Sequence, residues 1–144
     1  MVLLSTIKLF PLNPKSLSHI KLLEEYRQDN NISTPIGIYQ KEESFVDFSL
    51  DLLLEEKKKI KDICHIQGYK DIKSCTISVA SNKKKKRKIL SLATDYALNT
   101  LGMETVYLRI NPDDNNVIKY LEDNKFECLG DEKGSIIYLK EKTD

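Results

Sequence analysis

The stretch of residues 74–102, SCTISVASNKKKKRKILSLATDYALNTLG, constrains the fold more than any other part of the chain. It begins with the alternation typical of a strand, passes through six consecutive basic residues at 83–88, and continues with apolar residues at steps of three and four. That spacing predicts a helix that Gly102 ends. The apolar face of this helix would consist of Ile89, Leu92, Ala93, Tyr96, Ala97 and Leu101. The sequence therefore predicts a strand, a basic turn and a helix in direct succession.

A basic turn at the start of a helix favours a bound anion. The first backbone N–H groups of a helix lack helical partners and the helix dipole is positive at this end, so both attract a phosphate. The alternative is a solvated basic turn, since charge runs are common on surfaces. A nuclear localisation signal or a nucleic-acid patch is a weaker interpretation, because lysine and asparagine are abundant throughout the sequence.

The composition predicts one globular domain over residues 1–144, with 40% hydrophobic residues and no linker rich in Pro, Gly or Ser. The 23 basic and 22 acidic residues nearly cancel, so nucleic acid is not an expected partner and any electrostatic function must be local. No apolar run approaches the ~20 residues of a membrane span, and residues 1–4 lack the features of a signal peptide. We expect a cytoplasmic protein without a membrane partner.

The cysteines and histidines form no recognisable chemical motif. Cys64, Cys75 and Cys128 are odd in number and lack metal-ligand spacing, which indicates free thiols in a reducing compartment. The two histidines, His19 and His65, complete no zinc pattern. No Ser/His/Asp, Cys/His or paired-carboxylate arrangement is visible. We expect Cys128, at the end of a strand, to pack in the core.

The first half of the chain predicts strands at 6–12, 34–40 and 45–53 and helices at 17–30 and 55–68. Asn13 or Ser16 would cap the first helix, whose apolar face would contain Leu17, Ile20, Leu23 and Tyr26. The strands at 34–40 and 45–53 would form a hairpin. Asp47 and Asp51 interrupt the second of them, and we expect both on a solvent face, with a carboxylate at the mouth of a pocket as the alternative.

The second half is more regular. Strands are expected at 73–80, 104–110, 126–129 and 135–139, with helices at 87–101 and after Asn111. Asn111 would cap the latter helix and Pro112 would be its first residue. Because each of the first two strands leads directly into a helix, we expect a mixed α/β sheet with the strand at 73–80 in the centre. This strand would diverge from the strand at 104–110 and open a cleft.

Residues 77–139 resemble the acyl-CoA-binding half of the GNAT superfamily of N-acyltransferases. In that family a central strand leads into a Gln/Arg-x-x-Gly-x-Gly/Ala turn and a helix with paired leucines and a late Tyr-Ala. A strand, a polar turn, an Asn-x-x-Ala-x-x-x-Tyr helix and a Gly-Phe follow. The segment ILSLATDYALNTLGMETVYLRINPDDNNVIKYLEDNKFECLG has this order and spacing, and residues 6–54 are compatible with the family's opening elements. The resemblance implies a GNAT-like α/β fold, a central and mostly antiparallel sheet with flanking helices.

The sequence departs from the family at several functional positions. The family's Gln/Arg falls on Ser81 and its two glycines fall on Lys84 and Lys86, where side chains would hinder close approach of phosphates to the backbone. These lysines would either contact the phosphates themselves or mark a site that has lost acyl-CoA. The family's tyrosine, often the acid that protonates the leaving thiolate, falls on Leu121, one residue after Tyr120. The family's asparagine falls on Asp114 and its last glycine on Lys125.

The resemblance implies an acetyl-CoA-dependent N-acetyltransferase whose acceptor is a small-molecule amine or a peptide or protein amine. The alternative is a catalytically inactive GNAT-like binding or regulatory module. Tyr120 would be the catalytic acid, and a backbone N–H near Val79 would hold the thioester carbonyl. The sequence leaves the oligomeric state open, with a homodimer as one candidate. The residues expected to bind acetyl-CoA are Ser78, Val79, Ala80, Ser81, Asn82, Lys83, Lys84, Lys85, Lys86, Arg87 and Asn116.

Overall fold

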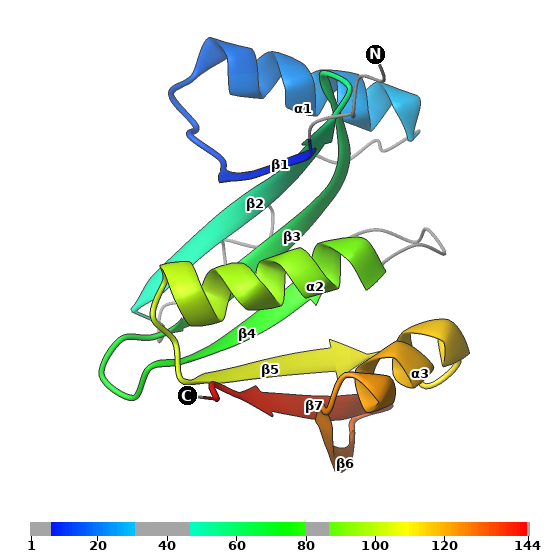
Figure 1. Ribbon diagram of the computed structural model, residues 1–144. Helices are drawn as coiled ribbons and strands as arrows, with labels where there is room; N and C mark the ends of the chain where they lie inside the picture. The colour runs from blue at the N-terminus through cyan, green and yellow to red at the C-terminus, as the bar shows by residue number, and fades with distance from the viewer. Residues whose placement is uncertain (1–6, 31–46, 80–86, 144) are drawn as a thin grey trace, which may run out of the picture.

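A computed structural model describes residues 7–30, 47–79 and 87–143, which form a seven-stranded sheet with flanking helices (Figure 1). The strand order is β1-β2-β3-β4-β5-β7-β6, and every neighbouring pair is antiparallel except β4 and β5. The mixed and mostly antiparallel α/β sheet expected from the sequence is confirmed. The strands are β1 (Ile7–Pro11), β2 (Phe48–Glu56), β3 (Lys59–Tyr69), β4 (Ser74–Val79), β5 (Thr105–Ile110), β6 (Glu127–Glu132) and β7 (Ser135–Glu141).

The helices are α1 (Leu17–Asp29), α2 (Arg87–Asp95) and α3 (Asn115–Asp123), with a π-helical turn, η2 (Tyr96–Thr100), directly after α2. Ser16 caps α1 as predicted, since its hydroxyl accepts from the backbone of His19 at 3.3 Å. The predicted cap at Asn111 is wrong. Its side chain accepts from the backbone N–H of Asp113 in a local turn, and α3 begins later with Asp114 as its cap.

The helix predicted for residues 55–68 is wrong, because this segment forms a β-hairpin of β2 and β3. Lys57 and Lys58 make the two-residue turn with φ of 55° and 64°, a conformation usually given to Asn-Gly pairs. The register shifts between Leu54 and Glu55, so Ile60 and Ile63 face the same side of the sheet. Because of this bulge, two apolar residues on one face of the strand are three positions apart, a spacing that looks helical in the sequence.

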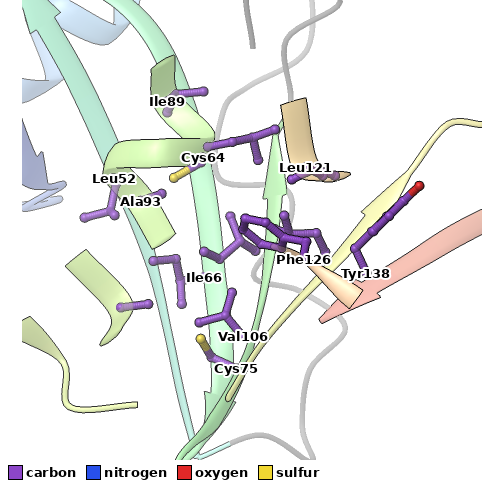
Figure 2. Packing of buried hydrophobic residues seen from close by; sticks show 14 of the residues in the cluster. Leu52, Cys64, Ile66, Cys75, Ile89, Ala93, Val106, Leu121, Phe126 and Tyr138 are labelled. Atoms are coloured by element: carbon purple, nitrogen blue, oxygen red, sulfur yellow. The ribbon is translucent and has the colours of Figure 1, made fainter. Parts of the chain in front are cut away.

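Buried side chains form two clusters, one on each face of the sheet, because neighbouring strand residues such as Leu52 and Leu53 point in opposite directions. The larger cluster lies under α2 and α3, and Figure 2 shows part of it, including Phe126. The smaller lies under α1 and contains Tyr26, Leu53, Ile60 and Ile63. Leu17 is 83% exposed, so its expected place on the buried face of α1 is wrong.

The parallel strands β4 and β5 pair over only part of their length. Residues 74–77 pair with residues 105–108, and the register ends before Ser78 and Val79. Figure 1 shows the arrowheads of the two strands moving apart at the end where α2 begins. The divergence predicted from the sequence is therefore confirmed.

Candidate functional site

The diverging ends of β4 and β5 border a small hollow of about 40 Å³. Backbone N–H and C=O groups that leave a strand ladder need other partners, which a ligand with amide groups can supply. The start of α2 lies at this same end of the sheet (Figure 1), so its positive dipole end is available to an anion nearby. The hollow is lined by Ile77, Val79, Leu90, Arg109, Ile110, Asn111 and Asp114.

The residues predicted to bind acetyl-CoA are placed only in part. Val79 lines the hollow, whereas Ser78 is exposed on the other face of the sheet. Asn116 is exposed in the first turn of α3, two residues after Asp114, which does line the hollow. Arg87 is the first residue of α2. The other predicted residues, Ala80, Ser81, Asn82, Lys83, Lys84, Lys85 and Lys86, lie outside the described part of the chain.

Tyr120 is half-buried on α3 and lines a different hollow, of about 450 Å³. Leu121, at the position of the family's tyrosine, is completely buried in the core. The catalytic role of Tyr120 stays a prediction. The larger hollow is also lined by Ile7 and Leu9 of β1 and by Lys88, Ser91 and Leu92 of α2.

One rim of this larger hollow carries an ion pair. The ammonium of Lys88 donates to the Glu56 carboxylate at 2.8 Å, and this hydrogen bond lowers the pKa of Glu56 below its ordinary value. The bond connects the first turn of α2 to the end of β2. Lys88, the last residue of the basic run, is therefore engaged within the protein.

The face of the sheet opposite α2 carries a polar cluster that the sequence did not reveal. Asp51 is only 2% exposed, so its expected place on a solvent face is wrong. Its carboxylate lies 2.9 Å from Nδ1 of His65, on the neighbouring strand β3. Nε2 of the same ring lies 3.2 Å from the hydroxyl of Ser49 and 3.2 Å from Oε1 of Gln67. If residues 59–69 had been predicted as a strand, that prediction would have placed His65 beside Asp51.

A third hollow, of about 350 Å³, lies on this same face, where β4, β5, β6 and β7 meet. Thr76 and Tyr107 form its floor, since they alternate with the core residues of β4 and β5. The Arg109 guanidinium lies 3.4 Å from the Glu132 carboxylate at its edge. The wall also includes Leu129, Gly130, Asp131 and Ile137.

The three cysteines are free. Cys64 and Cys75 are buried in the large cluster, and burial raises the pKa of the Cys75 thiol to about 12 and that of Cys64 still higher. Cys128 is exposed, so the prediction that it packs in the core is wrong. It lies on β6, an edge strand whose residues are all exposed.

Among the described residues no group of His, Cys, Asp and Glu side chains could hold a metal ion. Nor does any helix in residues 7–30, 47–79 and 87–143 have the length and apolar character needed to span a membrane.

Comparison with known proteins finds likeness at the level of structure. No family model and no curated protein matches the sequence. The Campylobacter jejuni N-acetyltransferase PseH is 16% identical with a TM-score of 0.65, and the match covers 95% of this chain and 99% of PseH. PseH in complex with acetyl coenzyme A gives a TM-score of 0.64 at the same identity, over 96% of this chain and 100% of PseH.

A second neighbour is a point mutant of the spermidine N-acetyltransferase SpeG from Vibrio cholerae. It is 13% identical with a TM-score of 0.63, and the match covers 94% of this chain and 93% of SpeG. At such identities the likeness concerns the fold. The chain has the fold of the GNAT N-acetyltransferases. Three observations support this: the order of the strands, the divergence of β4 from β5 and the likeness to these neighbours.

Proposed function

We propose that this protein is an acetyl-CoA-dependent N-acetyltransferase. The observation that carries the proposal is the end of the β4–β5 ladder at Ile77 and Leu108, beside the start of α2. The extended arm of acetyl-CoA contains amide groups, which can bond to the strand groups that the divergence frees. The donor's acyl carbonyl would accept from a backbone N–H near Val79, which would stabilise the negative charge that develops on the oxygen during transfer.

The phosphates of the donor would lie over the segment between β4 and α2. This segment contains residues 83–86 of the basic run, Arg87 and Lys88 begin α2, and α2 contributes the positive end of its dipole. We assign phosphate binding to residues 81–87, with Lys84 and Lys86 acting through their side chains in place of the glycines of related turns. Such contacts are ion pairs, so donor binding would weaken as salt rises.

The acceptor would approach from the face of the sheet opposite α2. The hollow of about 350 Å³ lies on that face next to β4. Arg109 and Glu132 of its lining form an ion pair, so Asp131 gives the wall one excess negative charge. A cationic amine suits such a wall better than an anionic acceptor does. SpeG is named for spermidine, so polyamines belong in the panel of acceptors, together with other small amines and peptide N-termini.

The second candidate function is a GNAT-like module that no longer transfers an acyl group. Leu121 is buried where the family places its acid, and lysines occupy the turn positions of its glycines. A general acid contributes on the order of 10²-fold or more to rate, so a protein without one would turn over slowly or not at all. Tyr120 is the hydroxyl on α3 that could replace it.

Calorimetric titration with acetyl-CoA, followed by release of free CoA in the presence of each amine, separates the two functions. We expect binding, and transfer to at least one amine. Val79→Phe should fill the divergence and weaken binding at least tenfold, about 1.4 kcal/mol. Leu139→Phe, a half-buried position on β7, is the matched control and should bind normally. No binding at millimolar acetyl-CoA and no transfer would overturn the enzyme. Light scattering of the same samples measures the oligomeric state, for which a homodimer is one candidate.

A further inference from the structure

The polar cluster on β2 and β3 has the connectivity of a proton relay. Its links run from the exposed Ser49 hydroxyl to Nε2 of His65 at 3.2 Å, and from Nδ1 of His65 to the Asp51 carboxylate at 2.9 Å. His65 is 4% and Asp51 2% exposed. A buried carboxylate needs a strong partner, and the imidazole provides one. The chain of hydrogen bonds therefore leads from the surface to a buried carboxylate.

The hydrogen positions follow from the chemistry of the partners. An ionised carboxylate can only accept, so Nδ1 of His65 carries the hydrogen and Nε2 presents a lone pair. Ser49 can then donate to Nε2. Once Nε2 gains a proton, Oε1 of Gln67, also 3.2 Å away, can accept from it. The two neighbours of Nε2 thus suit the neutral ring and the charged ring respectively.

The relay lies beside the place where β4 leaves β5. His65 pairs with Ser78 in the β3–β4 ladder, and paired residues point to the same face. Ser78 is the first residue of β4 beyond the last pair with β5. Ser49, where a proton would enter, lies on β2, two strands from β4, so at ~4.8 Å per strand the path covers ~10 Å and requires more than one bridging water molecule. Thr76 lines the hollow of about 350 Å³ and pairs with Gln67. It therefore connects this hollow with the polar cluster on β2 and β3.

A nucleophilic role for Ser49 fits less well. Ser49 lies within the β2–β3 ladder, paired with Gln67 and followed by the Leu50–Ile66 pair. Its neighbouring N–H groups therefore belong to a sheet, whereas a serine nucleophile needs free N–H donors aimed at the oxyanion. Proton acceptance makes no such demand on the backbone.

We propose that Ser49, His65 and Asp51 form the relay that accepts the proton of the acceptor amine, a proposal that rests on the proposed acetyl transfer. The ammonium gives one proton to Ser49 through a chain of water molecules, while the Ser49 proton moves to Nε2 of His65. The freed nitrogen lone pair bonds to the thioester carbon and the carbon–sulfur bond breaks. The second nitrogen proton goes to the departing thiolate, and the imidazolium later releases its proton to solvent. Asp51 positions the ring and stabilises the imidazolium.

The kinetic test compares His65→Gln with His19→Gln, a matched change of the other histidine on α1. We expect His65→Gln to lower kcat at least ~100-fold, as for a lost general base, with KM for acetyl-CoA within about twofold. The defect should shrink with methoxyamine as acceptor, because this amine is unprotonated at neutral pH, compared with the best alkylamine of the panel. A merely structural role would slow both acceptors equally and would overturn the relay.

A spectroscopic test needs no turnover. In ¹⁵N-labelled His19→Gln protein the His65 ring should show the Nδ1–H tautomer, and Asp51→Asn should change it. In wild type, His19 is the internal reference, since its Nδ1 accepts from the backbone of Asn13 at 2.9 Å and must carry hydrogen on Nε2. An Nε2–H tautomer for His65 would overturn the relay. If wild type transfers the acetyl group and His65→Gln transfers it equally well, the relay is overturned but the proposed acetyltransferase activity stands. If the protein neither binds acetyl-CoA nor transfers its acetyl group, both the relay and the proposed activity are overturned.

Discussion

Ile77 of β4 pairs with Leu108 of β5, and this is the last pair that joins the two strands. Four residues of each strand form the ladder, and beyond it Val79 of β4 and Arg109 and Ile110 of β5 border the hollow at the start of α2. A parallel pair of this kind would ordinarily continue to the strand ends, because each lost rung leaves backbone groups that need other partners. The early end of the β4–β5 ladder is therefore the feature of the fold at which a binding function can best be tested.

Charge reversal in the basic turn should weaken donor binding. If Lys84 and Lys86 contact the phosphates, the double variant Lys84→Glu/Lys86→Glu should lower acetyl-CoA affinity at least tenfold, about 1.4 kcal/mol. Wild-type affinity should also fall as salt rises, because exposed ion pairs are screened over ~8 Å at physiological ionic strength. Titration calorimetry measures both effects.

The control is Lys21→Glu/Lys142→Glu, which makes the same change in net charge at exposed positions on α1 and after β7. It should bind acetyl-CoA like wild type. Equal affinity of the two double variants would identify the basic turn as a solvated surface feature.

Removal of the Tyr120 hydroxyl tests the proposed acid. We expect Tyr120→Phe to lower kcat about 10²-fold if this hydroxyl protonates the leaving thiolate, with little change in KM for acetyl-CoA. The assay is CoA release with the best acceptor amine. Tyr96→Phe on η2 is the control, because it removes a half-buried hydroxyl from another helix. Transfer that is unchanged in Tyr120→Phe would leave the amine nitrogen or water as the source of the thiolate's proton, since Leu121 has none to give.

The thiols should differ sharply in reactivity. Alkylation requires the thiolate, and burial holds the pKa of Cys75 at about 12 and that of Cys64 above it. Cys128 is exposed on β6. We expect mass spectrometry after brief iodoacetamide treatment to find native protein labelled at Cys128, and unfolded protein labelled at all three positions. Rapid labelling of Cys64 or Cys75 in folded protein would contradict the core packing shown in Figure 2.

The order of elements after residue 73 could be predicted because each carries its own local pattern. The alternation in 104–110 places Val106, Leu108 and Ile110 in the core, as the structure confirms. The hairpin of β2 and β3 could not be predicted, because its turn uses Lys57 and Lys58 in place of turn-forming residues and its bulge breaks the alternation.

The polar cluster was missed for the same reason. Ser49 and Asp51 are two positions apart in one strand, and in the sequence this spacing indicates only the alternation of a strand. Their partner His65 lies in the segment that looked helical, and a helix would have directed it elsewhere. Sites assembled across strands depend on register, which a single sequence does not contain when the turn is unusual.

Gly68 provides a stability test of the same region. It lies within β3, where an added Cβ would approach the backbone of Ser74 and Cys75 at 2.3 and 2.7 Å, so β3 and β4 would have to move apart. We expect Gly68→Ala to lower the free energy of unfolding by about 2 kcal/mol or more, as for an overpacked core. Gly68→Asn should lower the free energy of unfolding at least as much as Gly68→Ala does. Urea denaturation followed by circular dichroism measures the change.

Gly102 is the matched control, because it is required for a different reason. Its φ is +75° and nothing lies within 4 Å of an added Cβ, so the restriction there is conformational. Asparagine tolerates the left-handed region better than alanine does. Gly102→Ala should therefore cost ~1 kcal/mol and Gly102→Asn less. If Gly68→Ala proves as stable as wild type, β4 does not pass this close to β3, and the pairing that brings His65 beside Ser78 would need revision.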